Sequence, residues 1–366
     1  MTRAAGLDFI VNKQNWHEHR FVDADVPRDP EPGEVLFRID RFAFTANNIT
    51  YALSGDMLGY WRFFPTREGW GRIPTMGFGD VIASAHPEVA DGTRCFGFFP
   101  MSRYLVIQPS VATASRIVDG AAHREGLAPV YAEYSPVEHD PLYSAEHEDP
   151  HILLRGLFTT SFLAEDFLVD NDLFGTRLVV ISSASSKTSI ALAFSTRRRG
   201  RAKAIGLTSA RNLDFVKGLG CYDQVLLYDE ISSLPAEAPA VLVDMAGNTQ
   251  VIRDVHHHFA SNLKYSCRIG ATHWAAGGDL GDLPGAKPEF FFAPTQIQKR
   301  ARDWGAAGLQ LRLGEAWADF RDASSDWLDV RRGYGREAVE RVYLDTLEAK
   351  TQPSDGHVLS LWDDAD

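Results

Sequence analysis

The sequence has little cysteine, no excess of positive charge and no long apolar run. Its 366 residues include three cysteines, Cys95, Cys221 and Cys267, which are far apart and form no paired motif. They exclude a four-thiolate zinc site, and their odd number argues against a disulfide framework. We therefore expect a reducing compartment, the cytoplasm.

The formal net charge of −12 argues against a large basic face on this protein. Nucleic acid and anionic membranes both require such a face, so neither is an expected partner. No stretch of 18 apolar residues occurs, and the first residues lack the apolar segment of a signal peptide. The composition, with 45% hydrophobic and 23% charged residues, is that of a globular protein, and the length allows two domains.

The first hundred residues read as short strands separated by glycine and proline. Residues 34–43 alternate apolar and polar side chains, and apolar stretches follow at 81–83, 94–99 and 104–107. Several short strands at this spacing predict a small barrel-like domain. Residues 110–150 carry little periodicity, and we expect either a functional lid or a loosely ordered insert.

From residue 153 onward, helical and strand patterns alternate. An amphipathic helix is predicted over 153–170, and four apolar residues at 178–181 read as a buried strand that runs into a helix. Such alternation predicts βαβ units and a parallel sheet. Further strands are expected at 202–207, 224–228, 240–244 and 265–270, helices at 186–199, 211–219, 248–260, 295–320 and 336–349, and a last strand at 357–362.

The turn after residue 181 is placed where α/β proteins bind a nucleotide phosphate, but it lacks the usual glycines. Small residues and hydroxyl donors stand there instead, followed by a lysine and a threonine in the first helical turn. Their side chains predict a pyrophosphate site made of Ser183, Ser185, Ser186, Lys187 and Thr188. The alternative is a helix capped by Ser185 or Ser186. A Walker A loop is a poor match, because both of its glycines are missing.

The end of the second strand of this unit bears on the choice of cofactor. NAD sites usually place an acid there, whereas NADP sites use small and basic residues for the 2′-phosphate. Here Thr208, Ser209 and Arg211 precede the first acid, Asp214. If a dinucleotide binds, this pattern predicts NADP(H). The alternative is that residues 209–212 only cap the next helix.

The order of these segments resembles the medium-chain dehydrogenase/reductase superfamily. Residues 32–39 are similar to its opening strand, 48–55 to a stretch of its quinone oxidoreductase branch, and 213–228 to its segment around the second βα unit. Residues 77–79, 182–188, 206–209 and 244–248 resemble signatures of the uncharacterised DUF2855 family. The resemblance implies an α/β protein with an N-terminal GroES-like β-barrel domain and a Rossmann domain with a doubly wound parallel sheet. We expect the first at 1–155 and 321–366, the second at 156–320, and a homodimer joined at the Rossmann sheet edge.

The resemblance also implies positions around the cofactor and the substrate. It places Tyr228 beside the adenosine, and residues near the nicotinamide at Gly247, Asn248, Gly270 and Thr272. His273 and Trp274 would then line a substrate cleft between the domains. Tyr51 aligns with a tyrosine of the quinone oxidoreductases and is the first candidate proton donor, with Asn48 and Tyr60 as neighbouring candidates. The alternative for both tyrosines is an ordinary half-buried ring.

Zinc ligands of the superfamily have no counterpart in this chain. Asn47 and Asn48 stand where a cysteine ligand would, residues 77–79 replace the Gly-His-Glu segment, and the four-cysteine lobe is missing. Residues 256–258 are three successive histidines, which point about 100° apart on a helix and cannot all reach one ion. We expect no metal.

The leading hypothesis is a zinc-independent, NADP(H)-dependent oxidoreductase. It would transfer a hydride to or from a conjugated carbonyl or quinone-like small molecule. Two alternatives keep the fold without redox activity. One is a cofactor-independent lyase or isomerase, and the other is a non-catalytic binding protein with a degenerate nucleotide site.

Overall fold

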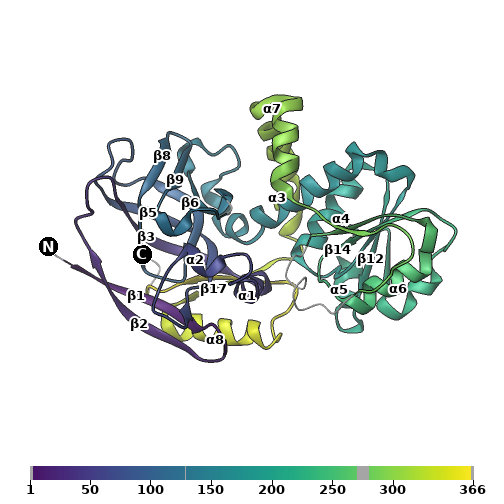
Figure 1. Cartoon of the computed structure of the whole chain (residues 1–366), viewed down its shortest axis with the longest axis horizontal. Coiled ribbons are helices and arrows are strands. Elements are labelled where there is room, and N and C mark those ends of the chain that lie inside the picture. The colour runs from purple at the N-terminus through teal and green to yellow at the C-terminus, as the bar shows by residue number, and fades with distance from the viewer. Residues whose placement is uncertain (1–2, 128, 270–279, 364–366) are drawn as a thin grey trace. The chain divides into compact units, whose positions relative to one another are not determined.

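The computed structural model describes residues 3–127, 129–269 and 280–363, and it divides into two compact units. The barrel unit comprises Met1–Leu153 and Leu328–Asp366, and the α/β unit comprises Leu154–Trp327. Helix α3 (Glu148–Asp170) begins in the first unit and continues in the second (Figure 1). No helix of the described residues is long and apolar enough to cross a membrane.

The barrel unit is built from two mainly antiparallel sheets. One has the strand order β2-β1-β4, and the other has the order β17-β18-β3-β5-β6-β10-β9-β8, with β7 also paired to β3. The strands are β1 (Arg3–Asn12), β2 (His19–Pro27), β3 (Val35–Phe44), β4 (Trp70–Gly71), β5 (Pro74–Ser84), β6 (Arg94–Pro100), β7 (Tyr104–Ile107), β8 (Pro109–Thr113), β9 (Arg116–Asp119), β10 (Glu133–Pro136), β17 (Asp329–Tyr334) and β18 (Asp355–Ser360). Its further helices are α1 (Ala46–Leu53), α2 (Tyr60–Phe63) and α8 (Gly335–Leu347).

The segment 110–150 corrects one expectation, since it is not a loosely ordered insert but part of a sheet. Strands β8, β9 and β10 extend the large sheet of the barrel unit along the edge of β6. Tyr134 of β10 is fully buried, stacks on Phe37 at 5.3 Å and donates a hydrogen bond to the carbonyl of Phe98. These strands are short and partly exposed, so they carry little of the periodicity by which strands are recognised.

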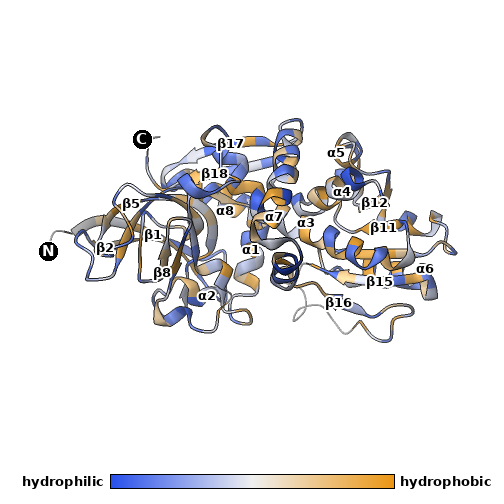
Figure 2. Ribbon diagram, turned by 90° about the horizontal axis from the view of Figure 1, so that it is seen from above, coloured by the Kyte–Doolittle hydropathy of each residue, from blue (hydrophilic) through white to orange (hydrophobic). Residues whose placement is uncertain are grey.

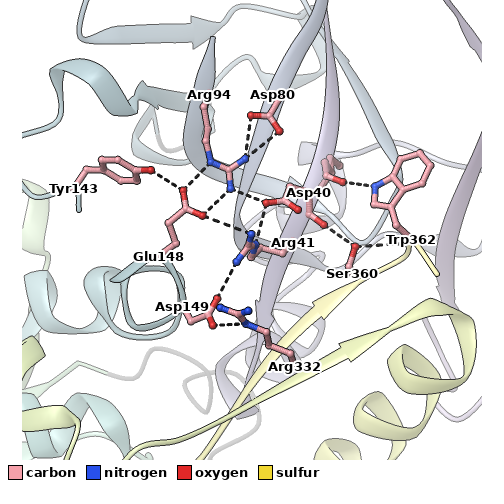
Figure 3. A network of polar contacts seen from close by, with 11 residues as sticks. Asp40, Arg41, Asp80, Arg94, Tyr143, Glu148, Asp149, Arg332, Ser360 and Trp362 are labelled. Carbon is pink, nitrogen blue, oxygen red and sulfur yellow. Dashed lines mark hydrogen bonds and ion pairs between the residues drawn. The ribbon is translucent and has the colours of Figure 1, made fainter. Parts of the chain in front are cut away.

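A network of ion pairs fixes the first turn of α3 to the barrel (Figure 3). The Arg94 guanidinium of β6 donates to both carboxylate oxygens of Glu148, at 2.7 and 2.8 Å, and it also contacts Asp80 of β5 and Asp40 of β3. Beside it, Asp149 accepts from Arg332 of β17 at 2.7 Å. Forked guanidinium contacts of this kind define an orientation as well as a distance, so the start of α3 is held in one direction on the barrel.

The α/β unit is a six-stranded parallel sheet with the order β13-β12-β11-β14-β15-β16. This is the doubly wound Rossmann arrangement, and the order reverses between β11 and β14. Because such crossovers are right-handed, the helices that lead toward β13 and those that lead toward β15 cover opposite faces. The strands are β11 (Leu178–Ile181), β12 (Lys203–Thr208), β13 (Gln224–Leu227), β14 (Ala240–Asp244), β15 (Leu263–Arg268) and β16 (Pro288–Phe290). The helices are α4 (Lys187–Arg199), α5 (Leu213–Gly218), α6 (Thr249–Phe259) and α7 (Ala293–Ser324).

The central strands of this sheet are apolar on both faces, as its burial between helices requires (Figure 2). Val180 of β11, Leu207 of β12 and Leu242 of β14 belong to one buried cluster and are at most 1% exposed. The predicted strands and helices of this half are confirmed in type, and α3 begins five residues earlier than its pattern indicated. A rigid sheet therefore presents the carboxyl ends of β11, β12 and β14 side by side.

Candidate functional site

The turn between β11 and α4 lies at the point where the strand order reverses. The Ser182 amide donates to the carbonyl of Val243 on β14, and the Ala184 amide donates to the carbonyl of Leu207 on β12. The turn is thus bonded to both neighbouring strands. Ligands of open α/β sheets bind at this switch point.

One residue of the turn takes the conformation for which glycine is normally chosen. Ser183 has a φ of 49°, in the left-handed region. The neighbouring strand makes room with a true glycine, Gly206, where an added Cβ would lie 2.9 Å from the Ala184 Cβ and 2.8 Å from the Tyr222 ring. The Tyr222 hydroxyl in turn donates to the Ala184 carbonyl at 2.9 Å. The turn keeps a tight shape although its own glycines are gone.

Serine hydroxyls bond the turn internally. The Ser186 side chain accepts from the Ser189 amide, so it caps α4. The Ser186 hydroxyl also donates to Ser189 Oγ at 2.8 Å, and the Ser189 hydroxyl donates to the Ser182 carbonyl at 2.9 Å. Capping by Ser186, the alternative to a phosphate contact, is therefore confirmed for this side chain.

The buried carboxylate of Asp244 holds the turn from the side of β14. Ser182 Oγ donates to Asp244 Oδ1 at 2.7 Å and accepts from the Met245 amide, while the Gly247 amide donates to Asp244 Oδ2 at 2.8 Å. Asp244 was not among the predicted site residues. Its position at the end of a buried strand was the available signal, but its partner lies 62 residues away in the sequence.

The end of β12 places the second group of predicted residues beside the turn. Thr208 is buried, Ser209 is half-buried and Arg211 is exposed. The idea that this segment only caps the next helix is wrong for two of its side chains, since neither Ser209 nor Asn212 makes a side-chain cap bond. Asn212 instead donates from Nδ2 to Ser185 Oγ at 2.9 Å.

The remaining predicted turn residues lie in the first turn of α4. Lys187 and Thr188 open the helix and are half-buried, and the Thr188 carbonyl accepts from the Ser161 hydroxyl of α3 at 2.8 Å. Tyr228 follows β13 at the start of a short 3₁₀ helix and packs on the apolar core of the unit.

The residues expected near a nicotinamide fall into two groups. Gly247 is buried and bonded to Asp244, and Asn248 caps α6 by accepting from two backbone amides. Gly270 and Thr272 lie outside the described residues, as do His273 and Trp274.

In the barrel unit, the side chain of Asn48 is fully engaged in holding α1. Its Oδ1 accepts from the Thr45 amide at 2.8 Å, and its Nδ2 donates to the Pro74 carbonyl at 2.9 Å. Asn48 is buried and forms a capping box with Thr45. The geometry favours a structural role for this residue.

Three tyrosines of the barrel unit form one cluster. The ring centroids of Tyr51 and Tyr60 are 4.5 Å apart, those of Tyr60 and Tyr131 are 5.7 Å apart, and the Tyr60 hydroxyl lies 3.5 Å from the Tyr131 hydroxyl. Burial, followed by the neighbouring Tyr131, raises the pKa of both Tyr51 and Tyr60 far above the ordinary value. Tyr131 was missed in the sequence, because it lies in the segment that resembled a loop.

Burial keeps the phenols of Tyr51 and Tyr60 neutral, and a neutral phenol can donate a hydrogen bond. The rings of Phe63 and Phe98 complete the aromatic surroundings, at 5.7 and 4.6 Å from the Tyr131 ring. Leu53, Met57, Leu58 and Val130, close in sequence to the three tyrosines, are exposed apolar side chains. Hydroxyl groups held among apolar side chains suit an uncharged substrate with a polar atom to be oriented.

The three successive histidines have separate environments. His256 is buried, with Nδ1 against the Pro284 carbonyl at 3.0 Å and Nε2 against Ser266 Oγ at 2.9 Å. His258 Nε2 bonds the Leu234 carbonyl, and His257 is exposed. Over the described ranges, no three His, Cys, Asp or Glu side chains are grouped so that they could hold a metal ion.

Solved structures with the same fold share little sequence with this chain. CurA from Vibrio vulnificus in complex with NADPH is 13% identical, with a TM-score of 0.60 over 97% of this chain and 98% of that one. TarJ from S. aureus in complex with NADPH is 9% identical, with a TM-score of 0.59 over 98% and 99%. The quinone oxidoreductase from Coxiella burnetii is 13% identical, with a TM-score of 0.53 over 97% and 99%.

These likenesses show the fold, a GroES-like barrel with a Rossmann unit. No curated protein matches the chain. A family model matches residues 42–352, and the family is described as a protein of unknown function, DUF2855. The chain therefore belongs to the DUF2855 family, with the fold of the quinone oxidoreductase-like proteins.

Proposed function

We propose that this protein is a zinc-independent oxidoreductase that binds NADP(H) and reduces a conjugated carbonyl or quinone-like small molecule. The observation that carries the proposal is the absence of an acid, among residues 182–188 and 208–213, at the switch point where dinucleotides bind. Neighbours of the same fold, CurA and TarJ, have structures in complex with NADPH.

The residues present fit such a cofactor. The turn consists of small residues, and an added side chain at Gly206 would collide with Ala184 of the turn. The nearby carboxylate of Asp244 is already bonded to Ser182 and Gly247. Arg211 and Ser209 supply a positive charge and a hydroxyl at the position that selects the 2′-phosphate. We assign the pyrophosphate to the turn and the first helical turn of α4, with Lys187 adding charge.

Bound NADPH would supply a hydride to the electron-poor carbon of the substrate. The reduction then needs one proton, and we assign its delivery to the tyrosine cluster of the barrel unit. Burial raises the pKa of Tyr51 and Tyr60, so both phenols stay protonated, and the Tyr60 hydroxyl donates to the Tyr131 hydroxyl. We assign to hydroxyls of this cluster the hydrogen bond to the substrate oxygen that gains negative charge. Asn48 acts by holding α1, which carries Tyr51.

Titration of the purified chain with NADPH, followed by nucleotide fluorescence, tests the proposal directly. We expect saturable binding that is tighter for NADPH than for NADH, with Ser209→Asp reversing the preference by adding the acid that NAD sites use. Lack of binding at millimolar nucleotide would overturn the redox function. Metal analysis of active protein should find no stoichiometric zinc, and a chelator should leave turnover unchanged.

We propose further that two copies pair along β16. This strand is at the edge of the described sheet, and Phe290 at its end and Phe292 just after it are about half exposed. An edge strand with exposed aromatic rings is a surface on which a second strand can add. Sedimentation should give a dimer, and Phe290→Ser with Phe292→Ser should give a monomer. A monomeric wild-type protein would overturn this assignment. We propose the cytoplasm as its location.

A further inference from the structure

The serines of the glycine-free turn differ in where their hydroxyl protons go. Ser186 donates to Ser189, and Ser189 donates to the Ser182 carbonyl. Ser182 donates to the carboxylate of Asp244. Each of these three hydroxyls has already used its single proton inside the protein.

Ser185 differs because its oxygen is used as an acceptor. The Asn212 side-chain amide donates from Nδ2 to Ser185 Oγ at 2.9 Å. An oxygen that receives this bond directs its own proton to another acceptor. Within the described residues, Ser185 donates no hydrogen bond from its side chain. Ser185 is half-buried and lies in the turn that follows β11.

We propose that Asn212 is a positioning residue that orients the Ser185 hydroxyl as a donor to a phosphate oxygen of NADP(H). The inference rests on the proposed function, since it assumes that the nucleotide binds at this turn. Phosphate oxygens are acceptors only, so they match the proton that Ser185 still has to give. Asn212 immediately follows Arg211, whose charge would favour the same anion.

Two parts of the cofactor, the pyrophosphate and the 2′-phosphate, have the required chemistry. The pyrophosphate is common to NADPH and NADH, whereas the 2′-phosphate is present in NADPH alone. A structural brace between the turn and the N-terminus of α5 would instead affect the stability of the protein without a nucleotide. Measurements of nucleotide affinity and of thermal stability therefore distinguish a phosphate-binding role of the Asn212–Ser185 pair from a purely structural one.

The experiment compares Ser185→Ala, Asn212→Ala, the double variant and Asn212→Asp in the full-length chain. NADPH and NADH dissociation constants are measured by fluorescence titration, and thermal unfolding is measured without nucleotide. Loss of one hydrogen bond to a charged group should weaken NADPH binding about tenfold to a hundredfold in Ser185→Ala. The double variant should be no weaker than Ser185→Ala alone, because Asn212 acts through Ser185. Asn212→Asp should also weaken binding, since a carboxylate takes up the Ser185 proton.

Asn262→Ala is the matched control, because the Asn262 amide donates to the Ala236 carbonyl in another part of the same unit. It should leave both dissociation constants unchanged. Weaker binding of NADPH alone assigns Ser185 to the 2′-phosphate, and weaker binding of both nucleotides assigns it to the pyrophosphate.

Two results would overturn the inference while the proposed function stands. One is wild-type binding of NADPH with dissociation constants of Ser185→Ala and Asn212→Ala within twofold of it. The other is a double variant whose loss equals the product of the two single losses. A wild-type protein that binds neither nucleotide would overturn the proposed function, and this inference with it.

Discussion

Ser182 donates a hydrogen bond of 2.7 Å to Asp244, and the two side chains join the ends of β11 and β14. Both are about 1% exposed. A serine of this glycine-free turn thus makes a side-chain contact that glycine cannot make. The turn is held by side chains as well as by its backbone.

Asp244→Asn should destabilise the α/β unit by about 1–3 kcal/mol, because an amide offers only one of the two acceptors that Ser182 and Gly247 require. Urea unfolding followed by circular dichroism measures the effect. Asp254→Asn is the matched control, since Asp254 is exposed and accepts from Gln250 Nε2 within α6. Equal unfolding midpoints for the two variants would contradict the role of Asp244.

The tightness of the turn can be tested at the strand beside it. Gly206→Ala adds a Cβ 2.8 Å from the Tyr222 ring and 2.9 Å from Ala184, so it should destabilise the unit and weaken NADPH binding by displacing the turn. Gly218→Ala is the control, because no atom lies within 4 Å of its added Cβ and the residue is helical. That control should be neutral or stabilising by up to about 1 kcal/mol. Equal effects of the two substitutions on NADPH binding would show that the turn tolerates displacement.

The Rossmann half was predictable because each of its elements is local. Residues 178–181 form a continuous apolar strand, and the helical period of the following segment starts where α4 starts. The strands of segment 110–150 were not predicted, for the opposite reason. β8 and β9 are short and partly exposed, and they are recognisable only by their partners in the sheet.

For the candidate site, the sequence predicts a location, the turn after β11, but not the hydrogen bonds within it. The sequence placed Ser185 and Ser186 in one turn, yet it contained nothing that distinguishes a cap from a candidate phosphate donor. In the structure their side chains have different partners. Ser186 bonds Ser189, three residues further on, and Ser185 bonds Asn212, 27 residues further on. Tyr131 likewise joins Tyr60 across 71 residues. Contacts of this range come from the sheet topology, which a single sequence does not reveal.

We expect the hydroxyls of the tyrosine cluster to be needed for the chemical step. Tyr60→Phe and Tyr131→Phe should each lower kcat by about 10²-fold or more, because either change removes a hydroxyl of the bonded pair that we assign to the substrate oxygen, with little change in the Kd for NADPH. Because burial raises the pKa of Tyr60, no loss of activity from this group is expected between pH 7 and 10. Tyr104→Phe is the control, since Tyr104 packs on Trp362. Unchanged kcat in both cluster variants would exclude these hydroxyls.

His256 should make the stability of the α/β unit depend on pH. Burial, the largest cause, lowers the pKa of His256 below its ordinary value near 6.5, so the unfolded chain binds more protons in the window below about pH 6.5. The contribution is complete above that pH and is lost as the pH falls through the folded pKa. His256→Asn keeps a donor for the Pro284 carbonyl without this titration, and its urea midpoint should vary less between pH 5 and 8. His257→Asn, at the exposed neighbouring position, should keep the wild-type dependence. Identical slopes for wild type and His256→Asn would mean that the buried imidazole is not the group that titrates.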